Sequence, residues 1–483
     1  MNSTNVLKRI STQIIDKKPI ANPGKLFLIS GFVFGMLMLI ITPPFQGPDE
    51  NVHFYRAAQI AKFDLTIDKD KDSGAIGGDL DTSFWALTRA LFDKPLLPFR
   101  PDNKISPDTI LDANSIDYTN KDGFYDFGGT ASNPPLVYLP SAAGITIGKT
   151  LHLSPLASFY LARLGGLLSW IAITYFAIKK IPSHKIALMI VNFLPMLVFQ
   201  VSVVTADTLS FALLSLFVAN IVYYRSQKED LTAKDWIKLI VLVILLSLSK
   251  RLFFVFVPLL LLIQPAANKF RNRVVQLGII AASVPISLAW GFAMEAQFGS
   301  KILVGGGADP EGQISFLKSD PLALKGIFEG TYLSSSSVNL FKSFIGVFGW
   351  VDTSMSIFVI LFSALVTFLA LSRGSVAETK EIEPTKTSLS NIEKLLWLAL
   401  AGTYFAAVNL AIYIYYSPVK TPFVFGLQGR YFIPILIVTL LMFLKARKHD
   451  SEKMITQKQL YIASQIVLTI SVIVIAFRYY PIV

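Results

Sequence analysis

The sequence predicts an all-α polytopic membrane protein with about eleven transmembrane helices. Three observations support this prediction. Of the 483 residues, 53% are hydrophobic and 16% are charged, whereas a soluble chain carries about 25% charged residues. Apolar runs approaching the ~20 residues that a helix needs to cross the hydrocarbon core recur along the chain. Lys and Arg gather in the short segments between those runs, as the positive-inside rule expects of cytoplasmic loops.

The composition also argues against several kinds of site. The chain has no Cys, so it has no disulfide, thiol nucleophile or thiolate metal site. Its four His argue against a His-rich metal centre. The net charge of +12 is explained by cytoplasmic loop cations, and we expect no nucleic-acid partner. We expect no required cofactor and assign no metal ligands; a divalent metal is compatible with the acids present, but no motif calls for one.

The N-terminal segment is basic, and the first apolar run ends at Pro43 and Pro44 rather than at a small-residue cleavage site. We therefore expect a retained signal anchor with a cytoplasmic N-terminus. The expected spans are Leu26–Ile41, Leu156–Ile178, Ile186–Val203, Leu209–Tyr224, Ile237–Leu248, Leu252–Ile263, Val274–Ala296, Ser354–Leu371, Leu395–Tyr415, Tyr431–Leu444 and Leu460–Ile475.

These spans divide the chain into regions with different expected surroundings. The regions are a cytoplasmic N-terminus (1–25), a first transmembrane helix (26–44), a large extracytoplasmic loop (45–155), a transmembrane core (156–297), a second extracytoplasmic segment (298–353), and C-terminal transmembrane helices (354–483) with a cytoplasmic linker (373–393).

The two extracytoplasmic segments are expected to be ordered. The first far exceeds ordinary loop lengths; in it "DLDTSFWALTRALF" has helical amphipathicity, and "NKDGFYDFGG" is typical of turns. The apolar stretch Asn133–Leu151 is rich in Pro and Gly, which disfavour a crossing helix, so we expect an interfacial helix there. In the second segment, "VNLFKSFIGVFGW" predicts another amphipathic helix.

Acidic residues follow the first span directly, in "PDENVHFYRAA". Asp49 and His53 are four residues apart, so they share a face if a helix begins at Asp49. One interpretation is structural, with Asp49 as a helix cap or first-turn acid. The other is catalytic, because a carboxylate desolvated at the membrane surface under a large loop can act as a base. Glu50 and His53 are then further catalytic candidates.

Cations lie next to apolar runs at two places. Lys250 and Arg251 separate two runs in "LSLSKRLFFVF", and Arg430 lies in "LQGRYFIP" between Gln428 and Tyr431. Cations within hydrophobic sequence are costly and often mark function. Arg binds phosphate with a planar fork, and Lys binds it as a point charge. The alternatives are snorkelling to the headgroups or anchoring at the interface.

Two more charged residues lie at expected span starts. Asp207 in "VVTADTLSF" is either a substrate ligand or an N-cap. Arg163 in "YLARLGG" could pair with an acid.

The order of these motifs resembles the integral-membrane glycosyltransferases of the GT-C fold, which use polyprenyl-phosphate-linked sugars. Within that group, the chain is most similar to the bacterial membrane family named domain of unknown function 2142. The motifs, in order, are "PDENVHFYRAA", "NPPLVYLP", "ARLGGLLS", "TADTLSF", "LSLSKR" and "QGRYFIP". The resemblance implies a GT-C-like fold with Asp49 as catalytic base, and with Glu50 or His53 orienting the acceptor or tuning Asp49. It further implies donor-phosphate binding by Lys250, Arg251 and Arg430, and substrate binding by Asp207, Arg163, Gln428, Tyr431 and Tyr138.

The implied activity is the transfer of a sugar, with inversion, from the lipid-linked donor to an extracytoplasmic glycan, lipid or protein acceptor. The implied location is the bacterial cytoplasmic membrane, with the active site facing outward. The chain has no Asp-x-Asp motif, so a metal–nucleotide-sugar site is unsupported. Two alternatives stay open: a transporter or flippase of envelope precursors, and a non-catalytic scaffold. No internal repeat is evident, and the polar motifs fall at expected span ends, which favours the transferase over the transporter.

Overall fold

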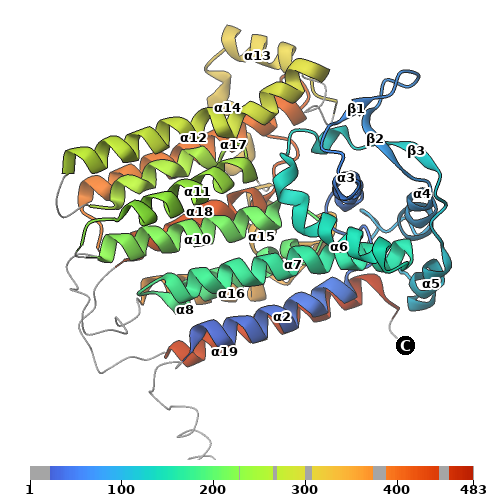
Figure 1. The fold of residues 1–483 in the computed structure, drawn as a ribbon, viewed down its shortest axis with the longest axis horizontal. Coiled ribbons are helices and arrows are strands. Elements are labelled where there is room, and N and C mark those ends of the chain that lie inside the picture. Colours follow the sequence, from blue (N-terminus) through green and yellow to red (C-terminus); the bar gives the residue numbers. More distant parts are fainter. Residues whose placement is uncertain are drawn as a thin grey trace, which may run out of the picture.

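The computed structural model describes residues 22–227, 229–264, 269–299, 307–334, 336–373, 388–444 and 456–481. Most of the expected cytoplasmic N-terminus and of the linker 373–393 lies outside these residues. The described chain forms a bundle of long helices with a smaller cap at one end, built from residues 45–154 (Figure 1).

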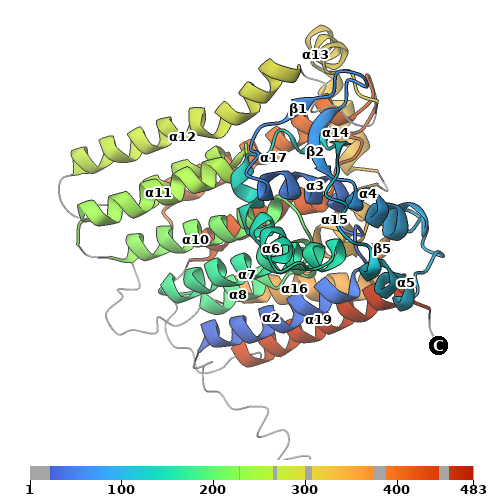
Figure 2. The same ribbon diagram turned by 45° about the vertical axis from the view of Figure 1, so that its right-hand side comes forward.

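Six helices of the described residues are long and apolar enough to cross a membrane. They lie roughly side by side in both views of the bundle (Figures 1 and 2). Most of α10 is buried inside the protein, whereas fewer than a quarter of the residues in the apolar parts of α12 and α17 are buried. These helices are α2 (Pro23–Ile41), α7 (Pro155–Lys180), α10 (Asp207–Ser226), α12 (Lys269–Phe298), α17 (Asn391–Tyr416) and α19 (Gln457–Tyr479).

The other five expected spans are helical but shorter or interrupted. Pro195 opens a second helix in one of them, and Pro258 lies inside the 3₁₀ helix of another, where it cannot donate a backbone hydrogen bond. The expected count of eleven spans therefore stays a prediction. The segments are α8 (Lys185–Asn192) with α9 (Pro195–Val201), α11 (Ala233–Ser249), η5 (Phe253–Leu262), α16 (Ile357–Ser372), and the run of η8 (Gly429–Phe432), α18 (Ile433–Thr439) and η9 (Leu440–Phe443).

The cap corrects the all-α expectation, because it contains a three-stranded antiparallel sheet in the order β1-β2-β3. Strand β3 pairs with β2 from Gly77↔Asp126 to Asp81↔Asp122. The elements of the cap are α3 (Glu50–Ala61), β1 (Asp68–Lys69), β2 (Ile76–Asp81), α4 (Ser83–Thr88), the π-helix η1 (Arg89–Asp93), α5 (Pro107–Asp112), η2 (Ala113–Ser115), β3 (Asp122–Asp126), η3 (Gly128–Thr130), η4 (Pro135–Tyr138) and α6 (Leu139–Thr150).

The segment "NKDGFYDFGG", which we expected to form a turn, contains strand β3. Its glycine serves close packing rather than a turn: a Cβ atom on Gly123 would lie 2.3 Å from the Trp85 ring. The opposite strand is equally crowded, since a Cβ on Gly77 would lie 1.7 Å from the Tyr125 carbonyl oxygen. Glycine therefore marks close approach within this sheet.

Helix α6 lies within the stretch Asn133–Leu151, and its 12 residues are too few to cross a bilayer. It packs closely on α7, where a Cβ on Gly144 would lie 2.0 Å from the Leu161 carbonyl oxygen. The expected interfacial position of α6 stays a prediction.

The second expected outer segment lies toward the cap end of the bundle (Figure 2). It contains α13 (Pro310–Ser319), α14 (Ala323–Tyr332), α15 (Ser336–Ile345), β4 (Val347–Phe348) and β5 (Thr353–Ser354). The helix expected in "VNLFKSFIGVFGW" ends at Ile345, because the following residues turn into the β4–β5 hairpin, where Gly349 has φ 63°.

Candidate functional site

Charged and polar side chains from five parts of the fold meet beneath the cap. The charges of Asp49, Arg430, Asp207 and Lys250 all act on the imidazole of His53. We call these residues, together with Tyr138, the charge cluster. They come from the start of α3, the turn before α6, the start of α10, the end of α11, and η8. The structure thus brings together residues that lie far apart in the sequence.

Asp49 precedes α3 in a left-handed conformation with φ 57°. Its side chain makes no capping hydrogen bond, and its backbone carbonyl accepts the His53 N–H at 3.1 Å. The capping interpretation therefore does not hold for the carboxylate, which is 55% exposed. Buried Phe45, in the turn just before, also has a positive φ, of 64°. A bulky residue in this region of backbone space indicates local strain.

Arg430 lies beside Asp49, with 3.9 Å between guanidinium and carboxylate. The Arg430 side chain is only 5% exposed, and it lies over the Tyr431 ring. Among the described residues, the buried Nε of Arg430 and the buried Oε1 of Gln428 have no hydrogen-bond partner. A buried guanidinium with an unfilled donor is costly in free energy, and an anionic ligand would offset that cost.

His53 is held at one ring nitrogen, with Nδ1 2.7 Å from the Tyr138 hydroxyl. That hydroxyl also accepts a hydrogen bond from Asn133 at 3.3 Å. Burial lowers the pKa of His53 to about 4, although the negative charge of Asp49 acts in the opposite direction. The imidazole is therefore neutral near pH 7, and it can orient a hydroxyl group without adding charge to the cluster.

Asp207 and Lys250 form an ion pair between the start of α10 and the end of α11. Asp207 is the first residue of α10 rather than its N-cap, which is Ala206. Its carboxylate therefore lies favourably at the positive end of the helix dipole while it binds Lys250. Both charges lie at helix ends, not in helix middles.

Glu50 and Arg163 form a fully buried ion pair, which does not belong to the charge cluster. Nε and one terminal nitrogen of Arg163 both donate to the Glu50 carboxylate at 2.7 Å. Arg163 also donates to the carbonyl oxygens of Leu39, Thr42 and Pro43, which lie at or just after the C-terminal end of α2. The pair therefore joins α7 to the end of α2 and the start of α3.

The Glu50 carboxylate accepts two further bonds, from the backbone N–H groups of Gly47 and Val204. With its hydrogen-bonding capacity filled inside the protein, it fixes the turn that carries Asp49. The geometry corrects the expectation that Glu50 and Arg163 face a substrate.

Arg251 and its neighbour Lys250 form ion pairs with different helices. Arg251 donates to Glu295 of α12 at 2.5 Å and lies over the Phe292 ring. The expected donor-phosphate set is therefore divided, because Lys250 binds α10 and Arg251 binds α12. We missed Glu295 in the sequence, although an acid within a long apolar run was a usable signal. Asn133, at the start of "NPPLVYLP", was missed as well.

Among the residues that the structure describes, no group of three or more His, Asp or Glu side chains is arranged to hold a metal ion.

Comparison with known proteins gives one match. No curated protein and no solved structure matches the chain. The family model described as predicted membrane protein (DUF2142) matches residues 32–439, a range that runs from the first long helix through the Arg430 motif. This match confirms the resemblance to DUF2142, and the chain belongs to the DUF2142 family of predicted membrane proteins.

Proposed function

We propose that the protein is a membrane glycosyltransferase that moves a sugar from a polyprenyl-phosphate-linked donor to an extracytoplasmic acceptor. The observation that supports this proposal most is the contact between Asp49 and Arg430. An exposed carboxylate lies 3.9 Å from a buried guanidinium that has an unpaired donor. A candidate base therefore lies beside a candidate phosphate ligand.

The proposed reaction is a single displacement. The acceptor hydroxyl oxygen attacks the anomeric carbon of the donor sugar, and the Asp49 carboxylate takes the hydroxyl proton. The bond from the anomeric carbon to the phosphate oxygen breaks, and its electron pair leaves with the polyprenyl phosphate. Arg430 stabilises the charge that develops on that phosphate. Attack from the face opposite the leaving group inverts the anomeric centre.

The remaining members of the charge cluster position the reactants. Lys250 adds positive charge near the phosphate, while its pairing with Asp207 fixes its place. Neutral His53, held by Tyr138, orients the acceptor hydroxyl toward Asp49. Gln428 and Tyr431, on either side of Arg430, contact the donor. The Glu50–Arg163 pair has a structural role, because it holds the Asp49 turn.

The proposal includes a location and partners. The protein lies in a bacterial cytoplasmic membrane in about eleven spans with a GT-C-like arrangement, its cap facing outward. Its partners are the lipid-linked sugar, an extracytoplasmic glycan, lipid or protein acceptor, and the bilayer. The apolar side chains exposed on the outer helices, such as Phe358 and Phe292, would contact lipid.

A labelled donor tests the function directly. Membranes of a deletion strain carrying the wild-type protein receive undecaprenyl phosphate linked to a radiolabelled hexose or pentose. We expect the label to move from the lipid to a water-soluble or protein-bound product, and we expect Asp49→Asn to abolish this transfer. If the label instead crosses the membrane still attached to its lipid, and Asp49→Asn leaves this movement unchanged, the protein is a transporter.

A further inference from the structure

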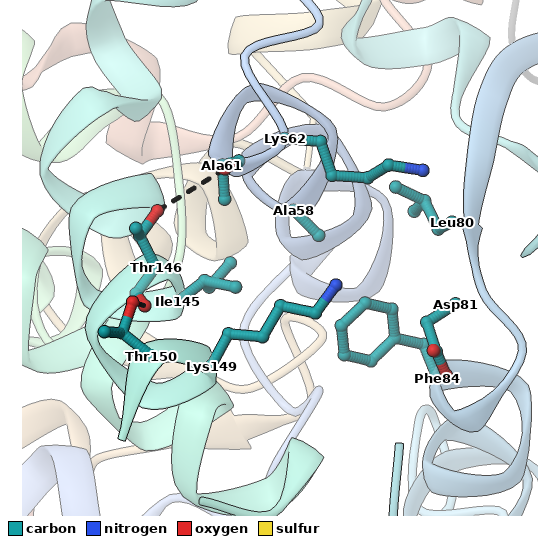
Figure 3. A pocket seen from close by; sticks show the side chains of 10 residues that line it. All are labelled: Ala58, Ala61, Lys62, Leu80, Asp81, Phe84, Ile145, Thr146, Lys149 and Thr150. Carbon is teal, nitrogen blue, oxygen red and sulfur yellow. Dashed lines mark hydrogen bonds between the residues drawn. The ribbon is translucent and has the colours of Figure 1, made fainter. Parts of the chain in front are cut away.

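A cavity of about 280 Å³ lies in the cap, outside the charge cluster. Its wall comes from α3 and α6 on one side and from β2 and α4 on the other (Figure 3). The volume lies just below the range of ligand pockets, roughly 300–1,000 Å³. It therefore suits one end of a ligand rather than a whole polymer. The lining residues are Ala58, Ala61, Lys62, Leu80, Asp81, Phe84, Ile145, Thr146, Lys149 and Thr150.

The same two helices connect this cavity to the charge cluster. Near their N-terminal ends, His53 of α3 contacts Tyr138, which precedes α6. Toward their C-terminal ends, the Thr146 hydroxyl of α6 lies within 3.5 Å of the Ala61 carbonyl oxygen of α3 (Figure 3). Helices α3 and α6 therefore run in the same direction. A helix rises 1.5 Å per residue, so Ala58 in the cavity lies about 14 Å along α3 from Asp49.

The cavity offers one available cation. Lys62 is already engaged, because it donates to the Asp122 carboxylate at 2.7 Å and to the Asp79 carbonyl oxygen. Lys149 lies over the Tyr118 ring and makes no ion pair within the described residues. Its ammonium group extends toward the Phe84 side of the cavity (Figure 3). The cavity thus places an unpaired positive charge beside an aromatic ring.

The one acid of the lining is occupied. The Asp81 carboxylate accepts hydrogen bonds from the backbone N–H groups of Ser83, Thr119 and Asn120. The hydroxyl groups of Thr146 and Thr150 donate to backbone carbonyls of α6, which leaves their oxygen lone pairs available to accept hydrogen bonds. The remaining wall is apolar, from Leu80, Ile145 and the alanines. The cavity therefore suits a compact anionic group with apolar faces and hydroxyl donors.

We propose that this cavity is an acceptor subsite that binds an acidic sugar unit of a glycan. The inference rests on the proposed function and names its substrate class. Lys149 binds the carboxylate or phosphate of the sugar, Phe84 packs against the C–H face of the ring, and the threonine oxygens accept hydrogen bonds from the sugar hydroxyls. The other end of the glycan then extends toward Asp49, which lies about 14 Å away in the direction of the α3 axis. Both walls of the cavity belong to the cap rather than to the long helices of the bundle, which favours a glycan over a lipid headgroup.

A binding experiment tests this subsite without requiring turnover. The full-length protein in phosphatidylcholine nanodiscs is titrated with two tetrasaccharides: hyaluronan tetrasaccharide, which alternates glucuronate and N-acetylglucosamine, and chitotetraose, which is neutral. We expect hyaluronan tetrasaccharide to bind roughly tenfold more tightly, as a hydrogen bond to a charged group allows. Lys149→Gln should remove that difference, and Lys149→Arg should retain it. Lys71→Gln, at an exposed lysine of the β1–β2 turn, is the matched control and should bind as the wild type does.

The outcomes separate this inference from the proposed function. Equal affinity for the two tetrasaccharides, or unchanged affinity in Lys149→Gln, overturns the subsite. Retention of phosphatidylglycerol by the wild type but not by Lys149→Gln, measured by native mass spectrometry from mixed nanodiscs, also overturns it, because the cavity then binds a lipid headgroup. Asp49→Asn should bind both tetrasaccharides as the wild type does. If acidic glycan binds while labelled donor is never consumed, the subsite stands and the transferase proposal fails.

Discussion

The carboxylate of Asp49 lies 3.9 Å from the guanidinium of Arg430, although the two residues belong to opposite ends of the chain. Asp49 follows the first long helix, and Arg430 precedes α18 near the C-terminus. The pair therefore depends on the packing of the whole bundle. Arg430 is buried while Asp49 is exposed, which is the arrangement expected if one binds a lipid phosphate at depth and the other meets an acceptor from outside.

Breaking the Glu50–Arg163 pair should destabilise the protein rather than change its chemistry. Glu50→Gln leaves Arg163 as a buried charge without its counter-ion, which typically costs about 3–5 kcal/mol. Thermal unfolding of the detergent-solubilised protein should show a clear fall in Tm. Asp49→Asn, at an exposed carboxylate one residue away, should unfold close to the wild-type Tm. A Glu50→Gln variant as stable as the wild type would contradict this structural role.

Arg430 should control donor binding through its fork-shaped geometry. Arg430→Gln removes the charge and should weaken binding of undecaprenyl phosphate by roughly 10- to 100-fold, since hydrogen bonds to charged groups contribute about 1.5–3 kcal/mol. Arg430→Lys keeps the charge without the planar fork, so its affinity for undecaprenyl phosphate should lie between those of the wild type and Arg430→Gln. Affinity can be measured by native mass spectrometry in nanodiscs.

The control for Arg430 is Arg251→Gln, because Arg251 is bound to Glu295 of α12 rather than to the charge cluster. It should leave undecaprenyl phosphate affinity near the wild-type value. Equal losses in the two variants would indicate a general electrostatic effect instead of a phosphate site at Arg430.

His53 should make stability depend on pH. Burial lowers its pKa to about 4 in the folded protein, against 6.5 for an ordinary His. Between these values the unfolded chain binds the additional proton, so the free energy of unfolding falls as the pH falls from 6.5 to about 4. His53→Gln, which does not titrate, should lose less stability over the same interval. Parallel curves of Tm against pH for the two proteins would refute a neutral, partly buried imidazole at His53.

Gly429 should be required for α15 to pack against η8, the short helix that contains Arg430. A Cβ on Gly429 would lie 2.2 Å from the backbone nitrogen of Phe344, and the Gly429 N–H donates to Ser343 at 2.8 Å. Gly429→Ala should therefore destabilise the protein by about 1–3 kcal/mol and weaken undecaprenyl phosphate binding. Gly326→Ala in α14, where no atom lies within 4 Å of the new Cβ, is the matched control. Similar Tm values for both variants would show that α15 moves to accommodate the added methyl group, so that Gly429 is not required.

Much of the charge cluster could be predicted from the sequence. Asp49, His53, Asp207, Lys250 and Arg430 lie next to apolar runs, and a charge in such a place marks either a helix end or a function. The expected topology places all these segment ends on one side of a membrane, and their meeting in space agrees with that expectation. The ion-pair partners of these charged residues could not be predicted so well, because pairing depends on side-chain direction.

Glu50 shows why side-chain direction is hard to predict from the sequence. It is adjacent to Asp49, but neighbouring residues on a helix do not face each other, so one carboxylate is exposed and the other is buried against Arg163. The sheet was missed for a different reason: β2 and β3 contain glycines, which are depleted in strands, and their pairing is non-local. Hydropathy likewise could not distinguish a long helix from the broken segments α8–α9 and η5.

The most direct test of the account is the surface glycan made by Asp49→Asn in a deletion strain that the wild-type gene restores. The variant should reach the membrane, unfold near the wild-type Tm and bind undecaprenyl phosphate, because Arg430 and the Glu50–Arg163 pair are intact. We predict that the glycan is lost all the same, since no base removes the acceptor proton. Wild-type amounts of glycan from this variant would contradict the catalytic role of Asp49 and, with it, the proposed transferase mechanism.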